Sequence, residues 1–311
     1  MNALQRTLSA PARLTGVGLH SGRTVTVEVL PAKPNSGIVF HRTDSEYAGS
    51  VEAHVFNVSA TELSTSIGIG ASAISTIEHL MAALAGLGID NATITIDGPE
   101  VPILDGSSTQ FVEAFLRAGI CVQRAKRHYF QVVSPFEFVR GDKWIRIEPH
   151  RRTRFKCSID FPVQVIGKQQ LEMNLTTQSF LDLANARTFC HVREVTAMRN
   201  AGFALGGSLE NAIVVDDAGV LNKEGLRSRD EFVRHKLLDA IGDFMLLGAP
   251  LIGKVTLHKS GHGMHAQCLE ELLRHKSRYL RDFVIDESIF DMGNEQAEEG
   301  MPLVAAAFSA V

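Results

Sequence analysis

Apolar and polar side chains alternate along several short stretches of this chain, a pattern typical of β-strands with one buried face. Residues 24–30 (TVTVEVL) alternate in this way before two prolines, and residues 91–97 (NATITID) form a second β-rich run. Between them, residues 75–88 (STIEHLMAALAGLG) start with Ser and Thr as N-caps, run through Ala and Leu, and stop at glycine, which predicts a helix. The same signals predict a helix over residues 105–119 (DGSSTQFVEAFLRAG). The first half therefore predicts alternating strands and helices.

The second half of the chain shows a similar order after a basic stretch, QRAKRH at 123–128, which predicts a loop. The later predicted elements are β-rich runs at 129–139, 144–149 and 155–162, a long helix at about 228–247, a strand at 254–260 and a loop, GHG, at 261–263. Comparison of HLMAALAG with HKLLDAIG aligns His79 with His235, so an internal duplication and a chance likeness of two helices both stay open. We expect two α+β domains joined near residues 122–128.

Composition excludes several classes of protein. With 45% hydrophobic and 21% charged residues, the chain of 311 residues can bury one large core or two ordinary ones, so it is neither disordered nor fibrous. A formal net charge of −4 disfavours nucleic acid as a partner. Four cysteines without a CxxC pair predict reduced thiols, and neither a secretory signal nor a transmembrane segment is evident. We expect a cytoplasmic protein.

Histidines and carboxylates suggest a metal site. His235, Asp239 and Asp243 follow one another at intervals of four residues, so in a helix their side chains project along one stripe, and two of them can hold one ion. Such an i, i+4 pair of a histidine and an aspartate resembles the helical HExxH motif that binds zinc, with a carboxylate in place of one imidazole. A catalytic zinc needs a third protein ligand and one open position, and His79 is the best candidate for that ligand.

Two further residues fit acid–base chemistry around such an ion. Glu78 points away from the ligand direction of His79, because neighbouring helical residues are about 100° apart, so it can act as general base toward a water on the metal. His262 can donate a proton to a leaving amine if Asp243 orients it and raises its pKa. Together these residues predict hydrolysis of an amide or an ester.

Each of these residues also has an ordinary explanation when taken alone. A His-x-x-x-Asp pair is common on helix surfaces, Glu78 and His79 can lie on an exposed helical face, and His262 can be a simple loop residue. A magnesium-dependent phosphohydrolase is one alternative, which the two histidines disfavour. A binding protein with a structural zinc is another, although structural sites usually have four cysteine-rich ligands. The glycine-rich stretches at 16–18, 68–70 and 206–207 lack a phosphate-loop context and predict turns.

A resemblance to a known family favours the first interpretation. The matching segments are TGVGLHSG at 15–22, STIEHLMAALAGLGIDN at 75–91, PEVPILDGSS at 99–108, ARTF at 186–189, LGGSLENAIVVDD at 205–217, DEFVRHKLLDAIGD at 230–243 and KSGH at 259–262. In this order they closely resemble UDP-3-O-acyl-N-acetylglucosamine deacetylases. The resemblance implies a Zn²⁺-dependent amidohydrolase that removes acetate from UDP-3-O-acyl-N-acetylglucosamine, the committed step of lipid A synthesis in Gram-negative bacteria.

The resemblance also assigns roles to individual positions. It implies zinc ligands at His79, His235 and Asp239, a general base at Glu78, a protonated histidine at His262 held by Asp243, an oxyanion-stabilising hydroxyl at Thr188, contacts to the diphosphate end of the substrate from Lys236 and His20, and a site-lining ring at Phe189. Thr188 should affect turnover more than binding, because such a donor acts on developing charge.

The fold that the resemblance implies is α+β, with two similar domains, each a β-sheet layered on helices, the active site between them and a small insert in each. We expect an N-terminal domain over 1–125, a C-terminal domain over 126–290 with its insert at about 190–220, and a flexible tail over 291–311. The apolar residues of this insert can enclose the acyl chain; they are Val192, Val195, Met198, Phe203, Ala204, Leu205, Ile213 and Val214.

Two departures from the family pattern concern the surroundings of the site. Cys190 and His191 follow ARTF where a glycine and an apolar residue are expected, and Ser64 and Ser66 replace cysteines found in some members. Both leave the acyl-chain preference open, and Cys190 is expected to be a buried, unreactive thiol. The apolar end of the tail also suggests recognition by a protease.

Overall fold

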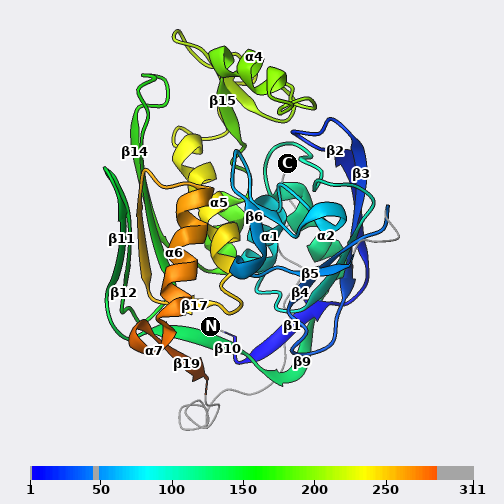
Figure 1. Cartoon of the computed structure of the whole chain (residues 1–311), viewed down its shortest axis with the longest axis vertical. Helices are drawn as coiled ribbons and strands as arrows, with labels where there is room; N and C mark the ends of the chain where they lie inside the picture. The colour runs from blue at the N-terminus through cyan, green and yellow to red at the C-terminus, as the bar shows by residue number, and fades with distance from the viewer. Residues whose placement is uncertain (1, 45–48, 286–311) are drawn as a thin grey trace, which may run out of the picture.

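Two five-stranded sheets with the same strand order frame the computed structural model (Figure 1), which describes residues 2–44 and 49–285. In spatial order the first sheet contains β2 (Ala12–Val17), β3 (Thr24–Pro31), β8 (Ala92–Ile96), β4 (Ile38–Arg42) and β5 (Ser50–Glu52). The second contains β11 (Phe136–Arg140), β12 (Lys143–Glu148), β18 (Lys254–His258), β13 (Arg154–Asp160) and β14 (Lys168–Asn174).

The two sheets agree in strand direction as well as in order. In each sheet only the third and fourth strands in space run parallel, β8 with β4 and β18 with β13, while the other neighbours are antiparallel. In each half, a long helix precedes the third strand in space and another follows it. The two halves of the chain therefore repeat one topology. The predicted α+β class with two similar halves is confirmed.

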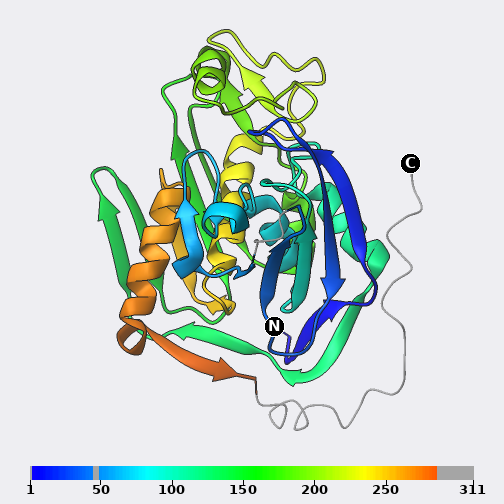
Figure 2. The ribbon, with the colours of Figure 1, turned by 45° about the vertical axis from the view of Figure 1, so that its right-hand side comes forward.

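Helices fill the space between the two sheets. Figure 1 and Figure 2 show α1 (Glu78–Leu87) and α2 (Thr109–Ala118) on the side of the first sheet, and α5 (Glu231–Met245) and α6 (His262–Arg274) on the side of the second. Side chains alternate between buried and half-buried along β13, as one buried sheet face requires. The buried faces of the sheets and helices merge into one large hydrophobic core.

The central contact of the molecule is between α1 and α5. Gly242 of α5 permits it, because a Cβ at that position would lie 2.0 Å from the carbonyl oxygen of Glu78 in α1. Gly86 holds the equivalent place in α1, where a Cβ would lie 2.0 Å from the ring of Phe180 in α3 (Thr177–Leu183). The aligned glycines of HLMAALAG and HKLLDAIG thus serve close helix packing in both halves.

The junction between the halves is built of strands. Residues 123–128 were predicted as a loop, which is wrong: β9 (Ile120–Lys126) pairs with β1 (Leu4–Leu8), and exposed polar residues on its outer face conceal the strand pattern. After Arg127, β10 (His128–Val132) pairs with β17 (Leu251–Ile252) and β19 (Leu280–Val284) of the second half. Because the pairing partners change there, we propose that the domain boundary lies at Arg127.

Each half carries a small additional unit. In the first, η1 (Val55–Asn57) and η2 (Gly70–Ser72) flank the two-stranded sheet of β6 (Val58–Ala60) and β7 (Ser66–Ile67). In the second, β15 (Phe189–His191), α4 (Val192–Asn200) and β16 (Ile213–Val215) form a parallel strand–helix–strand unit at the top of Figure 1. The short helix α7 (Lys276–Tyr279) precedes β19.

Two predicted helix starts were wrong. The helix predicted from Ser75 begins at Glu78, because Ser75 pairs as a bridge with Glu100 and Thr76 adopts a positive φ of 58° while its hydroxyl donates to Glu100. The helix predicted from residue 105 begins at Thr109. Both ends were predicted correctly, at Gly88 and Gly119, which take positive φ values that glycine tolerates.

The remaining predictions concern the whole chain. Over residues 2–44 and 49–285, no helix combines the length and apolar character needed to cross a bilayer. All four cysteines are free thiols, as predicted. The predicted tail at 291–311, together with its suggested protease recognition, lies outside the described residues.

Candidate metal centre and active site

Three predicted metal ligands converge from the two central helices. Asp239 lies one turn after His235 on α5, and its Oδ1 atom is 3.2 Å from Nε2 of His235 and 3.4 Å from Nε2 of His79 on α1. The two imidazole rings stand edge to face with centroids 4.9 Å apart. All three side chains are buried, with at most 3% of each residue exposed. Residues 156 positions apart in the sequence therefore form one cluster.

The chemical state of this cluster suits a cation. Burial lowers the pKa of His235 to about 3, so its imidazole is neutral, and Nδ1 donates a hydrogen bond of 3.1 Å to the carbonyl of Ala186. That bond leaves the lone pair of Nε2 directed at the cluster. Oδ1 of Asp239 is buried and has no hydrogen-bond partner among residues 2–44 and 49–285, an arrangement that costs free energy unless an ion occupies the place. Two imidazole nitrogens and one carboxylate oxygen are a ligand set of catalytic zinc.

Lys236 completes the polar surroundings of Asp239. Its ammonium donates a hydrogen bond of 2.9 Å to Oδ2 of Asp239 and lies 5.6 Å from the centre of the Phe189 ring. Burial works against the charge of Asp239, but the Lys236 ammonium, which donates a hydrogen bond to its carboxylate, holds the pKa of Asp239 well below its ordinary value. Burial likewise lowers the pKa of Lys236, yet the neighbouring carboxylates, above all Asp239, hold it above its ordinary value.

Glu78 lies next to the cluster in the first turn of α1. The residue is 3% exposed, and its Oε2 accepts a hydrogen bond of 3.0 Å from the backbone N–H of Thr65. Burial raises the pKa of Glu78, which makes the carboxylate a stronger base than one at the surface. The alternative that Glu78 and His79 lie on an exposed helical face was wrong, because each of them is only 3% exposed.

His262 and Asp243 form a buried ion pair beside these residues. Nδ1 of His262 lies 2.8 Å from Oδ2 of Asp243, and Nε2 lies 4.0 Å from Oδ2 of Asp239. Burial lowers the pKa of His262, but Asp243 more than offsets this and raises it to about 9. His262 is therefore cationic near neutral pH. The predicted loop position was wrong, since His262 is the first residue of α6.

Thr188 and Phe189 belong to a segment that packs against His235. The segment that contains them supplies the Ala186 carbonyl to His235, and the Phe189 ring stands 6.2 Å from the His235 ring. The backbone of Thr188 is fixed on both sides, by Gly106 and by Ile213. A buried ion pair between Arg187 and Glu231, with N···O of 2.9 Å, ties this segment to the start of α5.

His20 lies where the first domain meets the second insert. The backbone N–H of His20 donates to Glu100 at 2.8 Å, and its carbonyl accepts from the N–H of Leu205 at 3.2 Å. Its Nε2 is buried and lacks a partner within the described residues, and burial lowers its pKa. Figure 2 shows the insert beside this end of the first sheet.

The second insert presents apolar side chains to its surroundings. No residue of α4 within the structure is fully buried, and Val192 and Leu205 are 42% and 53% exposed. Met198 and Phe203 are half-buried, whereas Ile213 on β16 is fully buried and packs the unit together. The eight apolar residues predicted for this insert therefore divide between its surface and its core.

The residues that depart from the family pattern lie near the site, and none of them is indicated as a reactive group. Cys190 is half-buried, and burial raises the pKa of its thiol, so the group is a poor nucleophile, as expected. His191 is buried and caps α4, because its Nδ1 accepts a hydrogen bond from the N–H of Arg193. Ser64 is buried and Ser66 half-buried on either side of Thr65.

Three supporting features were not predicted from the sequence. Thr65 donates its hydroxyl to Oδ1 of Asp243 at 2.5 Å, and it also holds Glu78 through its backbone. His265 is bonded to Asp243 at 2.7 Å. The third feature is the pair of Arg187 with Glu231. The spacing of His265 three residues after His262 was the one available signal, because both lie on the same face if the segment is helical.

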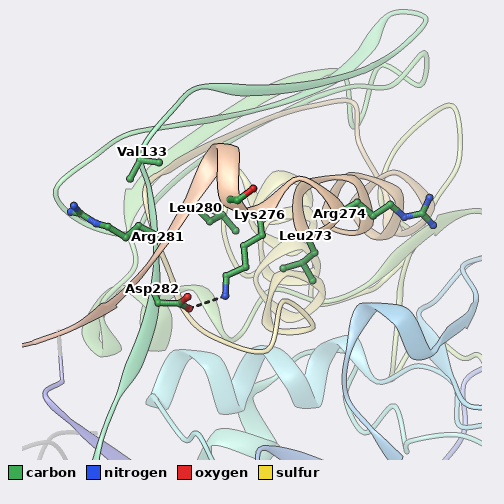
Figure 3. A pocket seen from close by; sticks show the side chains of 8 residues that line it. Val133, Leu273, Arg274, Lys276, Leu280, Arg281 and Asp282 are labelled. Carbon is green, nitrogen blue, oxygen red and sulfur yellow. Dashed lines mark hydrogen bonds and ion pairs between the residues drawn. The ribbon is translucent and has the colours of Figure 1, made fainter.

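A surface pocket elsewhere in the second half is separate from this cluster. Figure 3 shows it between α6, α7 and β19, where Lys276 and Asp282 form an ion pair of 2.9 Å. Its lining residues are Val133, Leu273, Arg274, Lys276, Ser277, Leu280, Arg281 and Asp282. None of the residues predicted for the active site borders it.

A family model and the relatives of this chain agree on one family. The family model described as "UDP-3-O-acyl N-acetylglycosamine deacetylase" matches residues 5–274. A protein of Citrifermentans bemidjiense named UDP-3-O-acyl-N-acetylglucosamine deacetylase is 49% identical over 276 residues, which cover 88% of this chain and 90% of that protein. A protein of the same name from Acidithiobacillus ferrooxidans is 49% identical and covers 86% and 90% of the two chains. Another from Brucella melitensis is 41% identical and covers 90% and 98%. The chain therefore belongs to the UDP-3-O-acyl N-acetylglycosamine deacetylase family.

Proposed function

We propose that this protein hydrolyses the N-acetyl group of UDP-3-O-acyl-N-acetylglucosamine and releases acetate, as a step of lipid A biosynthesis in the cytoplasm. Family membership and the names of relatives that match along almost the whole chain support the substrate. The observation that carries the chemistry is the buried convergence of His79, His235 and Asp239 beside an acidic and a basic side chain.

We propose that His79, His235 and Asp239 hold a zinc ion. The neutral imidazole of His235, the imidazole of His79 and the Asp239 oxygen that has no hydrogen-bond partner within the described residues match its preferred ligands. When bound, zinc supplies Lewis-acid activation of water and of the amide carbonyl. Lys236 leaves Asp239 one carboxylate oxygen for the ion, because the other accepts a hydrogen bond from the Lys236 ammonium.

Glu78 acts as the general base in this proposal. Its buried carboxylate takes a proton from the attacking water, whose oxygen forms a bond to the acetyl carbon. The raised pKa favours this transfer, since a base is most effective when its pKa approaches the working pH. The N–H of Thr65 holds one carboxylate oxygen and leaves the other for the water.

His262 acts as the general acid. Its imidazolium gives the Nε2 proton to the sugar nitrogen as the C–N bond breaks, so the products are the free amine and acetate. Asp243 stabilises the charged form before the transfer and holds Nδ1, which directs Nε2 toward the metal ligands.

The remaining predicted residues position the substrate. The Thr188 hydroxyl donates to the oxygen that becomes negative in the transition state, a contribution of about 3 kcal/mol for donors of this kind. Phe189 lines the sugar site, and Lys236 and His20 face the diphosphate end. The exposed apolar residues of α4 and its flanking loop receive the acyl chain, where each buried methylene contributes about 0.8 kcal/mol.

Acetate release tests this function directly. The purified protein is incubated with UDP-3-O-acyl-N-acetylglucosamine, and acetate and the free amine are measured with and without a chelator. UDP-N-acetylglucosamine, which lacks the acyl chain, is the matched control substrate. We expect acetate from the acylated compound only, with loss of activity after chelation and recovery with zinc. Equal release from both substrates would contradict the substrate assignment.

A further inference from the structure

A second histidine is bonded to the carboxylate that holds His262. Nδ1 of His265 lies 2.7 Å from Oδ2 of Asp243, the same oxygen that Nδ1 of His262 approaches at 2.8 Å. His265 is 2% exposed, so it exchanges neither bond for one to bulk water. His265 has no role in the proposed reaction. Burial of a polar side chain costs free energy of folding unless its hydrogen bonds compensate, so these bonds need an explanation.

Both ring nitrogens of His265 have a hydrogen-bond partner. Nε2 of His265 lies 2.9 Å from the hydroxyl of Ser260, which can donate to it. Nδ1 donates to Asp243, because a carboxylate oxygen only accepts, and Nε2 pairs with the Ser260 hydroxyl, so both ring nitrogens are satisfied. The ring also stands edge to face with Phe244, at a centroid distance of 6.0 Å. These contacts fix the plane of the imidazole.

Through these bonds His265 joins three segments that determine where His262 lies. Ser260 belongs to the turn after β18, in which Lys259 has a positive φ of 52°. Asp243 belongs to α5, one turn after the proposed ligand Asp239, and His265 itself lies in the first turn of α6. Gly261, the N-cap of α6, supplies no side-chain cap. His265 therefore connects the start of α6 both to α5 and to the preceding turn.

Within the described part of the chain, Asp243 accepts three side-chain hydrogen bonds, which restrain the rotation of its carboxylate. Oδ1 accepts from the Thr65 hydroxyl, and Oδ2 accepts from the two imidazoles. Among the described side chains, loss of His265 leaves Oδ2 with His262 alone, so the Thr65 hydroxyl, which bonds Oδ1 and lies 3.2 Å from Nδ1 of His262, is the one remaining restraint on the pair. A displacement of about 1 Å in a catalytic group is enough to lower turnover strongly.

We propose that His265 is a positioning residue that fixes Asp243, and through it the imidazole of His262, in the geometry required for proton transfer. The inference rests on the proposed function. It assigns His265 an effect on turnover and none on substrate binding, because its side chain is buried behind Asp243 and faces no substrate.

Two substitutions separate the bond to Asp243 from the bond to Ser260. In His265→Asn the amide nitrogen can take the place of Nδ1 and donate to Asp243, while the bond to Ser260 is lost. In His265→Leu both bonds are lost at similar volume. We expect His265→Leu to lower kcat by about 10-fold to 100-fold, as is usual for partners that orient an active-site group, with KM and bound zinc unchanged. We expect His265→Asn to restore most of kcat.

The outcomes are decisive in each case. Equal kcat losses in the Asn and Leu variants, or a change in KM instead of kcat, would overturn the positioning role. If His265→Leu does not fold, His265→Gln replaces it, since its longer amide reaches Ser260 but not Asp243, and a Gln variant as active as the Asn variant would contradict the inference. Absence of acetate release by the unaltered protein would instead refute the proposed function, so the two failures are distinguishable.

Discussion

Replacement of Gly242 by alanine tests whether the close contact of α1 and α5 determines the metal site. The added Cβ would lie 2.0 Å from the carbonyl oxygen of Glu78 and 3.1 Å from the backbone nitrogen of Ala82. Both are backbone atoms of α1 and cannot rotate away. Restoring an ordinary contact of about 3.4 Å requires α5 to move from α1 by about 1.4 Å. His79 moves with one helix, and His235 and Asp239 with the other.

Two opposed effects determine how much Gly242→Ala changes the free energy of unfolding. Overpacking of a core costs about 1–3 kcal/mol or more, and a backbone clash at this distance belongs at the upper end. Alanine favours the helix over glycine by about 1 kcal/mol. We therefore expect a net loss of about 2 kcal/mol in the free energy of unfolding, which lowers Tm by about 4–8 °C in a domain of this size. Separation of the ligands should also weaken zinc binding.

Thermal unfolding of the zinc-free protein and competition with a fluorescent chelator measure the two effects separately. Gly86→Ala is the matched control, because its Cβ meets the Phe180 ring and not α5, so it should lower Tm while zinc affinity stays unchanged. In Gly219→Ala the added Cβ meets no atom of the described residues within 4 Å, so this variant should change neither Tm nor zinc affinity. A Gly242→Ala protein with unchanged Tm and zinc affinity would refute the reasoning, as would an equal loss of zinc affinity in Gly86→Ala.

Three other predictions concern the catalytic residues. Glu78→Gln should keep one zinc per chain but lower kcat by about 10²-fold to 10⁴-fold, the usual contribution of a general base; metal analysis that finds the zinc lost would make Glu78 a ligand. The pH profile of kcat/KM should be bell-shaped: activity is lost as pH falls and Glu78, with its raised pKa, is protonated, and it is lost again above about pH 9 as His262 gives up its proton. In His262→Ala the basic limb should disappear, and a surviving limb would assign it to another group. Thr188→Val should lower kcat about 100-fold with little change in KM, whereas a rise in KM alone would assign Thr188 to binding.

Sequence patterns predicted the elements of this fold well where each element has one buried face. The alternation in residues 24–30 and the Ala- and Leu-rich run after Glu78 both correspond to observed elements, and terminal glycines marked the helix ends. The prediction of a loop at 123–128 was wrong because the strand there exposes Arg124 and Lys126 on one side. Pairing with β1, and not burial, determines the structure of this stretch. Such pairing is a long-range property that local patterns do not encode.

The ligand candidates were predictable because helical spacing places His235 and Asp239 on one face. Their convergence with His79 depends on Gly242, whose importance appears only when the two helices are packed. Thr65 was missed for a similar reason. It lies on neither helix, and a threonine between two serines has no local pattern that indicates a bond to Asp243, a residue 178 positions later in the sequence.

Titration of metal-free protein with zinc, read out as acetate release from UDP-3-O-acyl-N-acetylglucosamine, tests the central claim most directly. If His79, His235 and Asp239 hold one catalytic ion, activity should rise linearly and reach its plateau at one zinc per chain, and Asp239→Asn should require far more zinc for the same activity. Full activity of the metal-free protein, or a plateau that Asp239→Asn leaves in place, would contradict the account.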